Sequence, residues 1–198
     1  MNLTEARALL EWGARQNPGP WREHSLGVSR AAGTIAAACG MDAGRAAVLG
    51  LLHDIGRYEG VRGLHHAVAG YQLLMERDFP EGARVCVTHS FLTGDVRHFG
   101  GGAMDVSDEE LRLIETVLAR PFDDYDRLIQ LCDALTWGEG VCLMERRLVE
   151  AFLRHGVFEG MVEKWKKWFE LKAYFESKIG GGLYDLFPEC VEYTFHRP

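Results

Sequence analysis

The chain has 198 residues, of which 47% are hydrophobic, and its 29 acidic and 22 basic residues give a formal net charge of -7. A chain of this length can bury a full core, so we predict a single domain over residues 1–198. The acidic balance argues against a general nucleic-acid surface or a surface for anionic membranes. The chain begins without a basic region followed by an apolar stretch and has no run of about 18 apolar residues, so we expect a cytoplasmic protein.

Helical periodicity dominates the chain. The main β-branched run, Val85–Thr88, is too short to found a sheet. The predicted helices, in chain order, are Thr4–Gln16, Arg22–Cys39, Asp42–Ile55, His65–Arg77, Glu81–Ser90, Ser107–Leu118, Asp124–Trp137, Val141–His155 and Phe158–Lys178. The sequence therefore predicts an all-α protein.

Cap residues support several of these helix boundaries. Thr4 and Asp42 can cap helix starts, and Ser107 opens a capping-box pattern. Gly40 and Gly56 can close helix ends. The glycine- and proline-rich breaks between the helices are all short, so none of them predicts a disordered linker.

Two later segments have patterns of their own. The segment Thr93–Val106 holds four glycines and is the best candidate for a mobile loop, with a plain surface loop as the alternative. In the last predicted helix, apolar residues recur at helical spacing and should bury one face. These residues are Phe158, Met161, Trp165, Trp168, Phe169 and Phe175. The lysines of this helix are expected to be solvated, namely Lys164, Lys166, Lys167 and Lys172.

The cysteines do not have the spacing of a disulfide framework or a zinc knuckle. They are odd in number and scattered, at Cys39, Cys86, Cys132, Cys142 and Cys190. We expect most of them to be small buried hydrophobic residues. Cys132 is next to Asp133 and could be a soft metal ligand, but helix neighbours point about 100° apart, which favours a buried thiol.

The pair His53-Asp54 follows an apolar run and is the strongest chemical signal in the chain. Residues 46–56 contain no lysine or arginine that could pair with Asp54. Burying an imidazole and a carboxylate without strong partners costs several kcal/mol. A divalent cation accepts a neutral imidazole nitrogen and an anionic carboxylate oxygen in one shell. The pair therefore predicts metal ligands.

Four other residues of ligand type lie in segments that otherwise have a packing sequence: His24, His66, His89 and Asp133. Metal ligands on a helical scaffold come from several helices that point their polar residues to one interior position. A lone histidine or aspartate is more often a core or surface residue. Their order along the chain, a histidine, the His-Asp pair, further histidines and a distant aspartate, favours a shared metal site.

With this order, the chain resembles the HD-domain superfamily of metal-dependent phosphohydrolases over about residues 22–140. The matching residues are His24, His53, Asp54 and Asp133, and residues 53–57, HDIGR, resemble the HDIG variant. The resemblance implies an HD-domain-like bundle of about 8–10 helices with a helical extension over residues 141–198. It also implies that these four residues hold one metal.

The same resemblance implies ligands for a second ion. Two-metal members use extra histidines after the HD pair, and His66 and His89 match those places. The His-x-x-x-Gly string favours His66 over His65. Where the two-metal pattern often has paired histidines, this chain has only His89-Ser90, so one and two ions both stay open. Iron or manganese is favoured by the resemblance, and Zn, Co, Ni and Mg remain compatible.

The resemblance implies hydrolysis of a phosphate ester or anhydride of a nucleotide or another small phosphorylated molecule, with metal-bound hydroxide as the attacking group. Asp54 is then the expected bridge between two metals. Arg57 is the best candidate for a phosphate contact, and its alternative is an ion pair with Glu59 or another carboxylate. Arg62 and Arg97 are weaker candidates. His98 and the acidic cluster at residues 123–126 are placed outside the site.

Other functions stay open at this point. Residues 122–188 resemble bacterial HDIG proteins of unassigned substrate that continue into a helical tail, and this similarity names no reaction. Some proteins with the same helical core are similar to di-iron oxygenases. A non-catalytic binding or regulatory protein is a further alternative. The predicted partner is a small phosphorylated substrate, without general nucleic-acid or membrane binding, and a homodimer is also left open.

Overall fold

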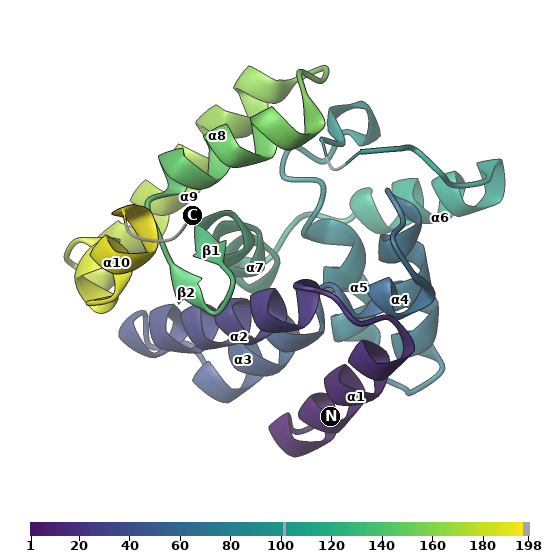
Figure 1. Ribbon diagram of the computed structural model, residues 1–198, viewed down its shortest axis with the longest axis horizontal. Helices are drawn as coiled ribbons and strands as arrows, with labels where there is room; N and C mark the ends of the chain where they lie inside the picture. The colour runs from purple at the N-terminus through teal and green to yellow at the C-terminus, as the bar shows by residue number, and fades with distance from the viewer. Residues whose placement is uncertain (101, 196–198) are drawn as a thin grey trace.

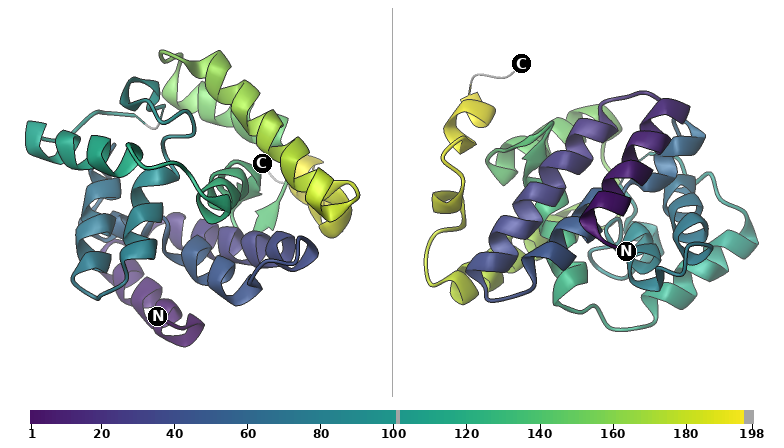
Figure 2. Two further views of the ribbon diagram at one scale, coloured as in Figure 1. Left: turned by 180° about the vertical axis from the view of Figure 1, so that it is seen from behind. Right: turned by 90° about the horizontal axis from the view of Figure 1, so that it is seen from below.

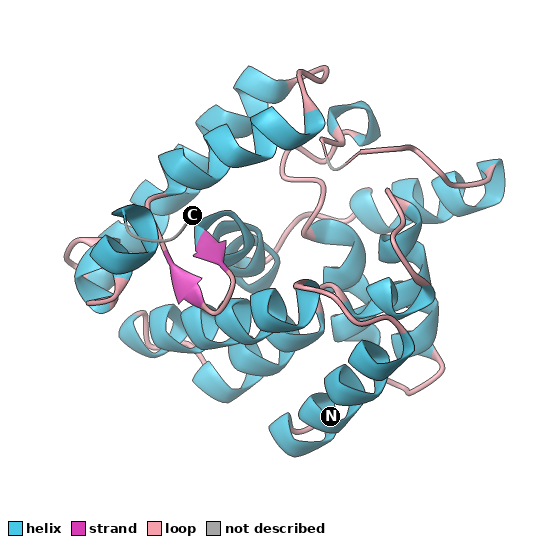
Figure 3. Ribbon diagram, viewed as in Figure 1, coloured by secondary structure: helices cyan, strands magenta, loops and turns pink. Residues whose placement is uncertain are grey.

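The computed structural model describes residues 1–100 and 102–195. Within them, the chain forms ten α-helices, three short 3₁₀ helices and one two-stranded hairpin (Figure 3). The α-helices are α1 (Leu3–Gln16), α2 (Trp21–Ala38), α3 (Ala43–Leu52), α4 (His65–Met75), α5 (Pro80–Thr88), α6 (Asp108–Leu118), α7 (Asp124–Leu135), α8 (Met144–His155), α9 (Met161–Ile179) and α10 (Cys190–Phe195). The predicted all-α class is confirmed. None of the described helices is long and apolar enough to cross a membrane.

Helix α7 occupies the centre of the molecule, where it is seen end-on in Figure 1. It contacts α2 and α3 on one side, α5 on another and α8 and α9 on a third. Figures 1 and 2 show α8 and α9 as a layer on one side of the remaining helices. The face of α7 that carries Leu128, Leu131 and Leu135 is fully buried in the main core. This central position explains why the last two turns of α7 are mainly apolar.

The helix starts follow the predicted caps with one exception. Asp42 caps α3 by accepting a hydrogen bond from the Arg45 backbone N–H at 2.9 Å, and Ser107 forms the predicted capping box. The predicted cap at Thr4 is wrong, because the cap lies two residues earlier. There Asn2 Oδ1 accepts from the Glu5 N–H at 3.0 Å, and asparagine is at least as good a cap as threonine.

The segment that follows α3 differs from the predicted helix Asp42–Ile55. Helix α3 ends at Leu52, and the 3₁₀ helix η1 (Ile55–Glu59) follows the His53-Asp54 pair. Gly56 therefore lies inside η1 and does not close a helix. A side chain at position 56 would overlap the His66 carbonyl and the Gly70 N–H, so glycine lets α4 pack directly on η1.

This close approach makes Gly56→Ala a test of the packing between η1 and α4. The added methyl group would meet backbone atoms, which cannot rotate away, so we expect a loss of about 1–3 kcal/mol in unfolding free energy. Thermal or urea unfolding measures this loss. Gly181→Ala is the control, because no atom lies near the methyl position there. Equal destabilisation by both substitutions would contradict the packing argument.

Two predicted helices are interrupted by a small hairpin. Helix α7 stops at Leu135, and β1 (Thr136–Trp137) pairs antiparallel with β2 (Gly140–Val141), so α8 starts later than predicted. The Thr136 hydroxyl donates to the Cys132 carbonyl at 2.7 Å and satisfies a group at the end of α7. The 3₁₀ helices η2 (Val96–His98) and η3 (Leu183–Leu186) and helix α10 were not predicted. Gly101 of the predicted glycine-rich loop lies outside the described residues.

The tail helix differs from the prediction at two positions. Lys164 is only 6% exposed, although it was expected to be solvated, and Phe169 is exposed, although it was expected to be buried. The reason is the helix period, since Lys164 lies four and eleven residues before Trp168 and Phe175 and shares their inward face. Trp165 also packs against the main core. Lys166 and Lys167 are exposed, as predicted.

The five cysteines are free thiols, and four of them are buried, in agreement with the prediction. Cys132 belongs to the main apolar core, and burial raises the pKa of its thiol well above the usual value. A buried neutral thiol among aliphatic side chains is a poor metal ligand. Asp133, about 100° further round α7, contacts His24 instead.

Candidate metal centre

Five segments bring six polar side chains to one interior position. They are His24 in α2, His53 and Asp54 at the end of α3, His66 at the start of α4, His89 at the end of α5 and Asp133 in the last turn of α7. The ring centroids are 5.3 Å apart for His24 and His53, 5.0 Å for His53 and His89, and 5.5 Å for His66 and His89. The structure thus brings together every metal ligand predicted from the sequence.

Backbone carbonyls fix the orientation of three imidazoles. The Nδ1 atoms of His53 and His66 each contact the carbonyl three residues earlier in the chain, at 2.7 Å for His53. Nδ1 of His89 lies 3.1 Å from the carbonyl four residues earlier. Because a carbonyl only accepts, each Nδ1 carries the hydrogen, and the lone pair is on Nε2. This is the arrangement of histidines that bind a metal through Nε2.

The Asp54 carboxylate lies between two groups of nitrogen donors. Its Oδ1 is 3.3 Å from His66 Nε2 and 3.6 Å from His89 Nε2, and these two nitrogens are 3.5 Å apart. Its Oδ2 is 3.9 Å from His53 Nε2. Ligand atoms with metal bonds of about 2.0–2.2 Å lie roughly 3–4 Å from one another. The spacing around Asp54 is therefore that of ligand atoms, with one oxygen directed to each group.

His24 and Asp133 form the more open side of the cluster. Nε2 of His24 is 2.9 Å from Asp133 Oδ1, which is also 4.0 Å from His53 Nε2. Both side chains are partly exposed, whereas those of His53 and Asp54 are buried. Ligand atoms of His24, His53 and Asp54 lie within 4.8 Å of one another, as do those of Asp54, His66 and His89. Asp54 is the member that the two groups share.

Two buried atoms at the centre of the cluster have no hydrogen-bond partner among the described residues. They are His53 Nε2 and Asp54 Oδ1. With a hydrogen on Nδ1, the neutral His53 ring has a lone pair on Nε2, so both atoms are electron-rich and lie in a buried space. Leaving such atoms unpaired costs free energy, which a cation bound beside them would remove. The residues present therefore fit a divalent cation.

Comparison with known proteins agrees with this cluster. A family model described as HD domain matches residues 21–138. The chain belongs to the HD-domain family. The matched segment contains all six donors of the cluster and ends before α8. No curated protein and no solved structure matched the chain.

In this HD domain, Arg57 binds the shared carboxylate. Its Nε lies 2.6 Å from Asp54 Oδ2, whereas Glu59 interacts with Tyr58 and His65. Arg57 thus pairs with a carboxylate, but with the buried Asp54 and not in the surface ion pair with Glu59 that the alternative expected. The guanidinium has four further N–H groups on Nη1 and Nη2, for which the described residues show no hydrogen bond and which could contact a phosphate.

The electrostatics of the HD-domain cluster favour cation binding at neutral pH. Burial lowers the pKa of His66 to about 4 and that of His89 to about 3, and it also lowers the pKa of His24. These imidazoles are therefore neutral and do not have to lose a proton. Burial is the largest single effect on Asp54 and acts to raise its pKa, but the Arg57 guanidinium and the imidazoles of the cluster together outweigh it and hold that pKa well below its usual value. Asp54 is consequently anionic.

Other polar residues considered from the sequence lie apart from the cluster. Arg97 forms an exposed ion pair with Asp95 at 2.6 Å, and Arg62 is exposed. His65 pairs with Glu59 and Glu110. None of these side chains contacts the six donors in the part of the chain that the structure describes.

The acidic cluster at the start of α7 has structural roles. Asp123 caps the helix and accepts from the Asp126 N–H at 2.9 Å. Asp126 is buried against Arg84 at 2.8 Å, and Asp124 pairs with Lys178 at 2.6 Å. These contacts account for the cluster by capping and ion pairing, in agreement with its exclusion from the predicted site.

Two residues that shape the site were not identified from the sequence. Asp105 accepts hydrogen bonds from the backbone N–H groups of Gly63 at 3.0 Å and His65 at 2.9 Å. It thereby fixes the start of α4 and the position of His66. The Ser90 hydroxyl lies 3.1 Å from His89 Nε2. Asp105 acts on residues about 40 positions earlier, so no local sequence pattern could have identified it.

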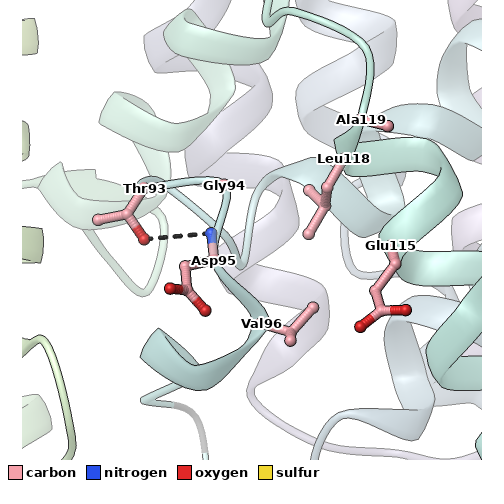
Figure 4. Close-up of a pocket in the computed structure, with 7 residues that line it drawn as sticks. All are labelled: Thr93, Gly94, Asp95, Val96, Glu115, Leu118 and Ala119. Carbon is pink, nitrogen blue, oxygen red and sulfur yellow. Dashed lines mark hydrogen bonds between the residues drawn. The ribbon is translucent and has the colours of Figure 1, made fainter.

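A surface depression of about 360 Å³ lies away from these donors (Figure 4). It is lined by Thr93, Gly94, Asp95, Val96, Glu115, Leu118 and Ala119. Its two ionisable lining residues, Asp95 and Glu115, are both acidic. A phosphorylated ligand would be repelled there, so the metal cluster remains the candidate site.

Proposed function

We propose that the protein is a cytoplasmic metal-dependent phosphohydrolase that cleaves a phosphate ester or anhydride of a nucleotide or another small phosphorylated molecule. The observation that carries this proposal is the buried Asp54 carboxylate, which directs one oxygen to each of two donor groups. A bound divalent cation would neutralise phosphoryl oxygens and lower the pKa of a coordinated water towards neutrality. Membership of the HD-domain family supports the same reaction class.

Different residues of the cluster would hold the cation and orient the phosphate. His53, His66 and His89 would hold the cation through Nε2, because their Nδ1 atoms are bound to backbone carbonyls. Asp54 would hold it through either or both oxygens. The partly exposed side of the cluster is where a substrate would enter. Arg57, held against Asp54, would direct its Nη groups to a phosphoryl oxygen and so orient the phosphorus for attack.

Iron or manganese is the proposed ion, and zinc, cobalt, nickel and magnesium are compatible with the donors. Mixed imidazole and carboxylate ligation suits several divalent metals, and affinity alone does not select among them. The buried group formed by Asp54, His66 and His89 supports a second ion beside the one held by His24, His53 and Asp54. Asp133 would complete the more exposed of the two sites.

Single substitutions in the buried donor group test whether a second ion binds. His66→Ala and His89→Ala should each lower the metal content of purified protein by about one ion per chain, because each removes an Nε2 donor from the buried group. Metal analysis by mass spectrometry measures the ratio. His65→Ala is the matched control, since this neighbouring side chain pairs with surface carboxylates. A wild-type ratio in both variants would leave a one-metal site.

The reaction itself can be tested with a phosphate-release screen. Metal-loaded protein would be incubated anaerobically with nucleotides, dinucleoside polyphosphates, cyclic dinucleotides and sugar phosphates. Phosphate or phosphomonoester release without oxygen supports hydrolysis and argues against an oxygenase. If fully metallated protein releases nothing from any of these classes, the proposed hydrolysis is contradicted and a non-catalytic binding role is favoured.

A further inference from the structure

Lys164 of α9 is a buried cation that has no carboxylate partner in the described part of the chain. Its Nζ donates to the Ser90 carbonyl at 2.9 Å. The ring centroids of Phe158 and Trp168 lie 5.6 and 5.3 Å from Nζ, respectively. No aspartate or glutamate in residues 1–100 and 102–195 forms an ion pair with it. An ammonium has three N–H groups, so two of them are left without a hydrogen-bond acceptor from the described chain. Burying a charge in this way is costly unless a further partner binds.

The carbonyl that accepts from this ammonium belongs to the residue that follows a donor of the metal centre. Ser90 directly follows the donor His89, and its hydroxyl contacts His89 Nε2. Asp133 lies on the central helix α7, and its negative charge acts to raise the pKa of Lys164 against the effect of burial. With burial as the larger effect, the pKa of Lys164 falls to about 8, so the amine is mostly protonated at neutral pH. A positive charge is thus held near a site where a phosphate would arrive.

Contacts with α7 and a small cavity define how Lys164 is held. The Trp168 indole donates to the Gln130 carbonyl of α7 at 3.1 Å and fixes α9 one turn beyond Lys164. A cavity of about 50 Å³ lies next to the lysine, between Leu148 of α8 and Phe158. The cavity leaves unfilled space beside the lysine side chain.

We propose that Lys164 is a phosphate-binding residue, supplied to the HD domain by the C-terminal helices. This inference rests on the proposed function. The chain has a net charge of -7, so an anionic substrate needs local positive charge at the site. Arg57 supplies one such charge but is bound to Asp54, whereas Lys164 has no acidic partner among the residues that the structure describes. Lysine binds phosphate as a point charge, and its flexible stem suits adjustment to the substrate.

A structural role for Lys164 is the alternative, because the Ser90 carbonyl lies just beyond the end of α5 and a cation there stabilises the helix. Lys164→Gln separates the two roles, since glutamine keeps an N–H donor for Ser90 but removes the charge. Lys164→Arg keeps the charge. Lys167→Gln is the matched control on the same helix, where the lysine is exposed and pairs with Glu170.

The probe is inorganic phosphate, titrated calorimetrically into metal-reconstituted protein. We expect Lys164→Gln to weaken phosphate binding about tenfold or more, the effect of losing one hydrogen bond to a charged group. Lys164→Arg and Lys167→Gln should stay within about threefold of wild type. Metal content should be equal in all four proteins. Wild-type phosphate affinity in Lys164→Gln, or no phosphate binding by metallated wild type, would overturn the assignment.

A second measurement covers the case in which Lys164→Gln does not fold. Arginine stays protonated at all relevant pH values, whereas Lys164, with a pKa of about 8, loses its proton between pH 7 and 9. Asp133, the charged group that acts on Lys164, stays anionic in this range. The phosphate affinity of Lys164→Arg relative to wild type should therefore rise up to about tenfold from pH 7 to pH 9. A constant ratio contradicts a phosphate contact.

The inference and the proposed function can fail separately. If metallated wild type binds phosphate through Lys164 but hydrolyses no ester or anhydride, the proposed reaction is wrong and the phosphate contact stands. If hydrolysis occurs and Lys164→Gln changes neither phosphate affinity nor KM, the contact is wrong and the reaction stands. A fall in KM alone would also argue against the contact, because loss of a phosphate-binding charge must raise it.

Discussion

Asp54→Ala should remove bound metal and hydrolysis together while leaving the helical content nearly unchanged. Asp54 is the carboxylate that both donor groups share, so its loss takes a ligand from each group. Loss of a side chain that only supports a metal ligand costs about 10–100-fold in affinity or activity, and a shared ligand should exceed that range. Metal analysis, circular dichroism and phosphate release measure the three quantities.

Asp95→Ala is the matched control for this substitution. Asp95 pairs with Arg97 on the surface and lies outside the donor cluster, so metal content and activity should equal those of wild type. The assignment of Asp54 is wrong if Asp54→Ala retains wild-type metal content. Loss of helical content in Asp54→Ala would show instead that Asp54 and Arg57 form a structural ion pair.

Metal binding should stabilise the fold by several degrees. His53 Nε2 and Asp54 Oδ1 are buried and have no hydrogen-bond partner within residues 1–100 and 102–195. A cation that binds only the folded chain adds about 2.7 kcal/mol at a free concentration near 100 times Kd. For a chain of this size, each kcal/mol raises Tm by roughly 2–4 °C. Differential scanning calorimetry of metallated and chelator-treated protein should therefore show a difference of about 5–10 °C.

The same comparison with Asp54→Ala distinguishes the centre from other binding sites. The variant lacks the shared ligand, so the metal-dependent rise in Tm should largely disappear. The Asp95→Ala control should keep the full rise. If chelator treatment leaves the Tm of wild-type protein unchanged, the buried donors do not hold a cation in the folded state.

Much of the cluster was predictable because its strongest signals are local. The His53-Asp54 pair directly follows an apolar run without a lysine or arginine, and this context shows in the sequence. The signals of His66 and His89 are local as well. His66 lies at the start of a helix and His89 at the end of one, each in a segment that otherwise has a packing sequence. The helices themselves follow from period and caps, as Asp42 and Ser107 show.

The errors arose where distant contacts decide the structure. Lys164 belongs to a run of lysines that looks solvated, and its burial depends on which face of α9 packs against α7. Asp105 and Gly56 act through backbone contacts with the segment around α4. Arg57 was expected to pair with a nearby carboxylate or to bind phosphate, and its pairing with Asp54 follows from the 3₁₀ turn that replaces the predicted helix end.

Metal analysis of freshly purified wild-type protein, repeated after reconstitution with iron or manganese, tests the central claim most directly. The cluster of His24, His53, Asp54, His66, His89 and Asp133 predicts stoichiometric metal, up to two ions per chain, which a chelator removes and reconstitution restores. Protein that carries no stoichiometric metal when isolated and takes up none on reconstitution would contradict a metal centre at these residues.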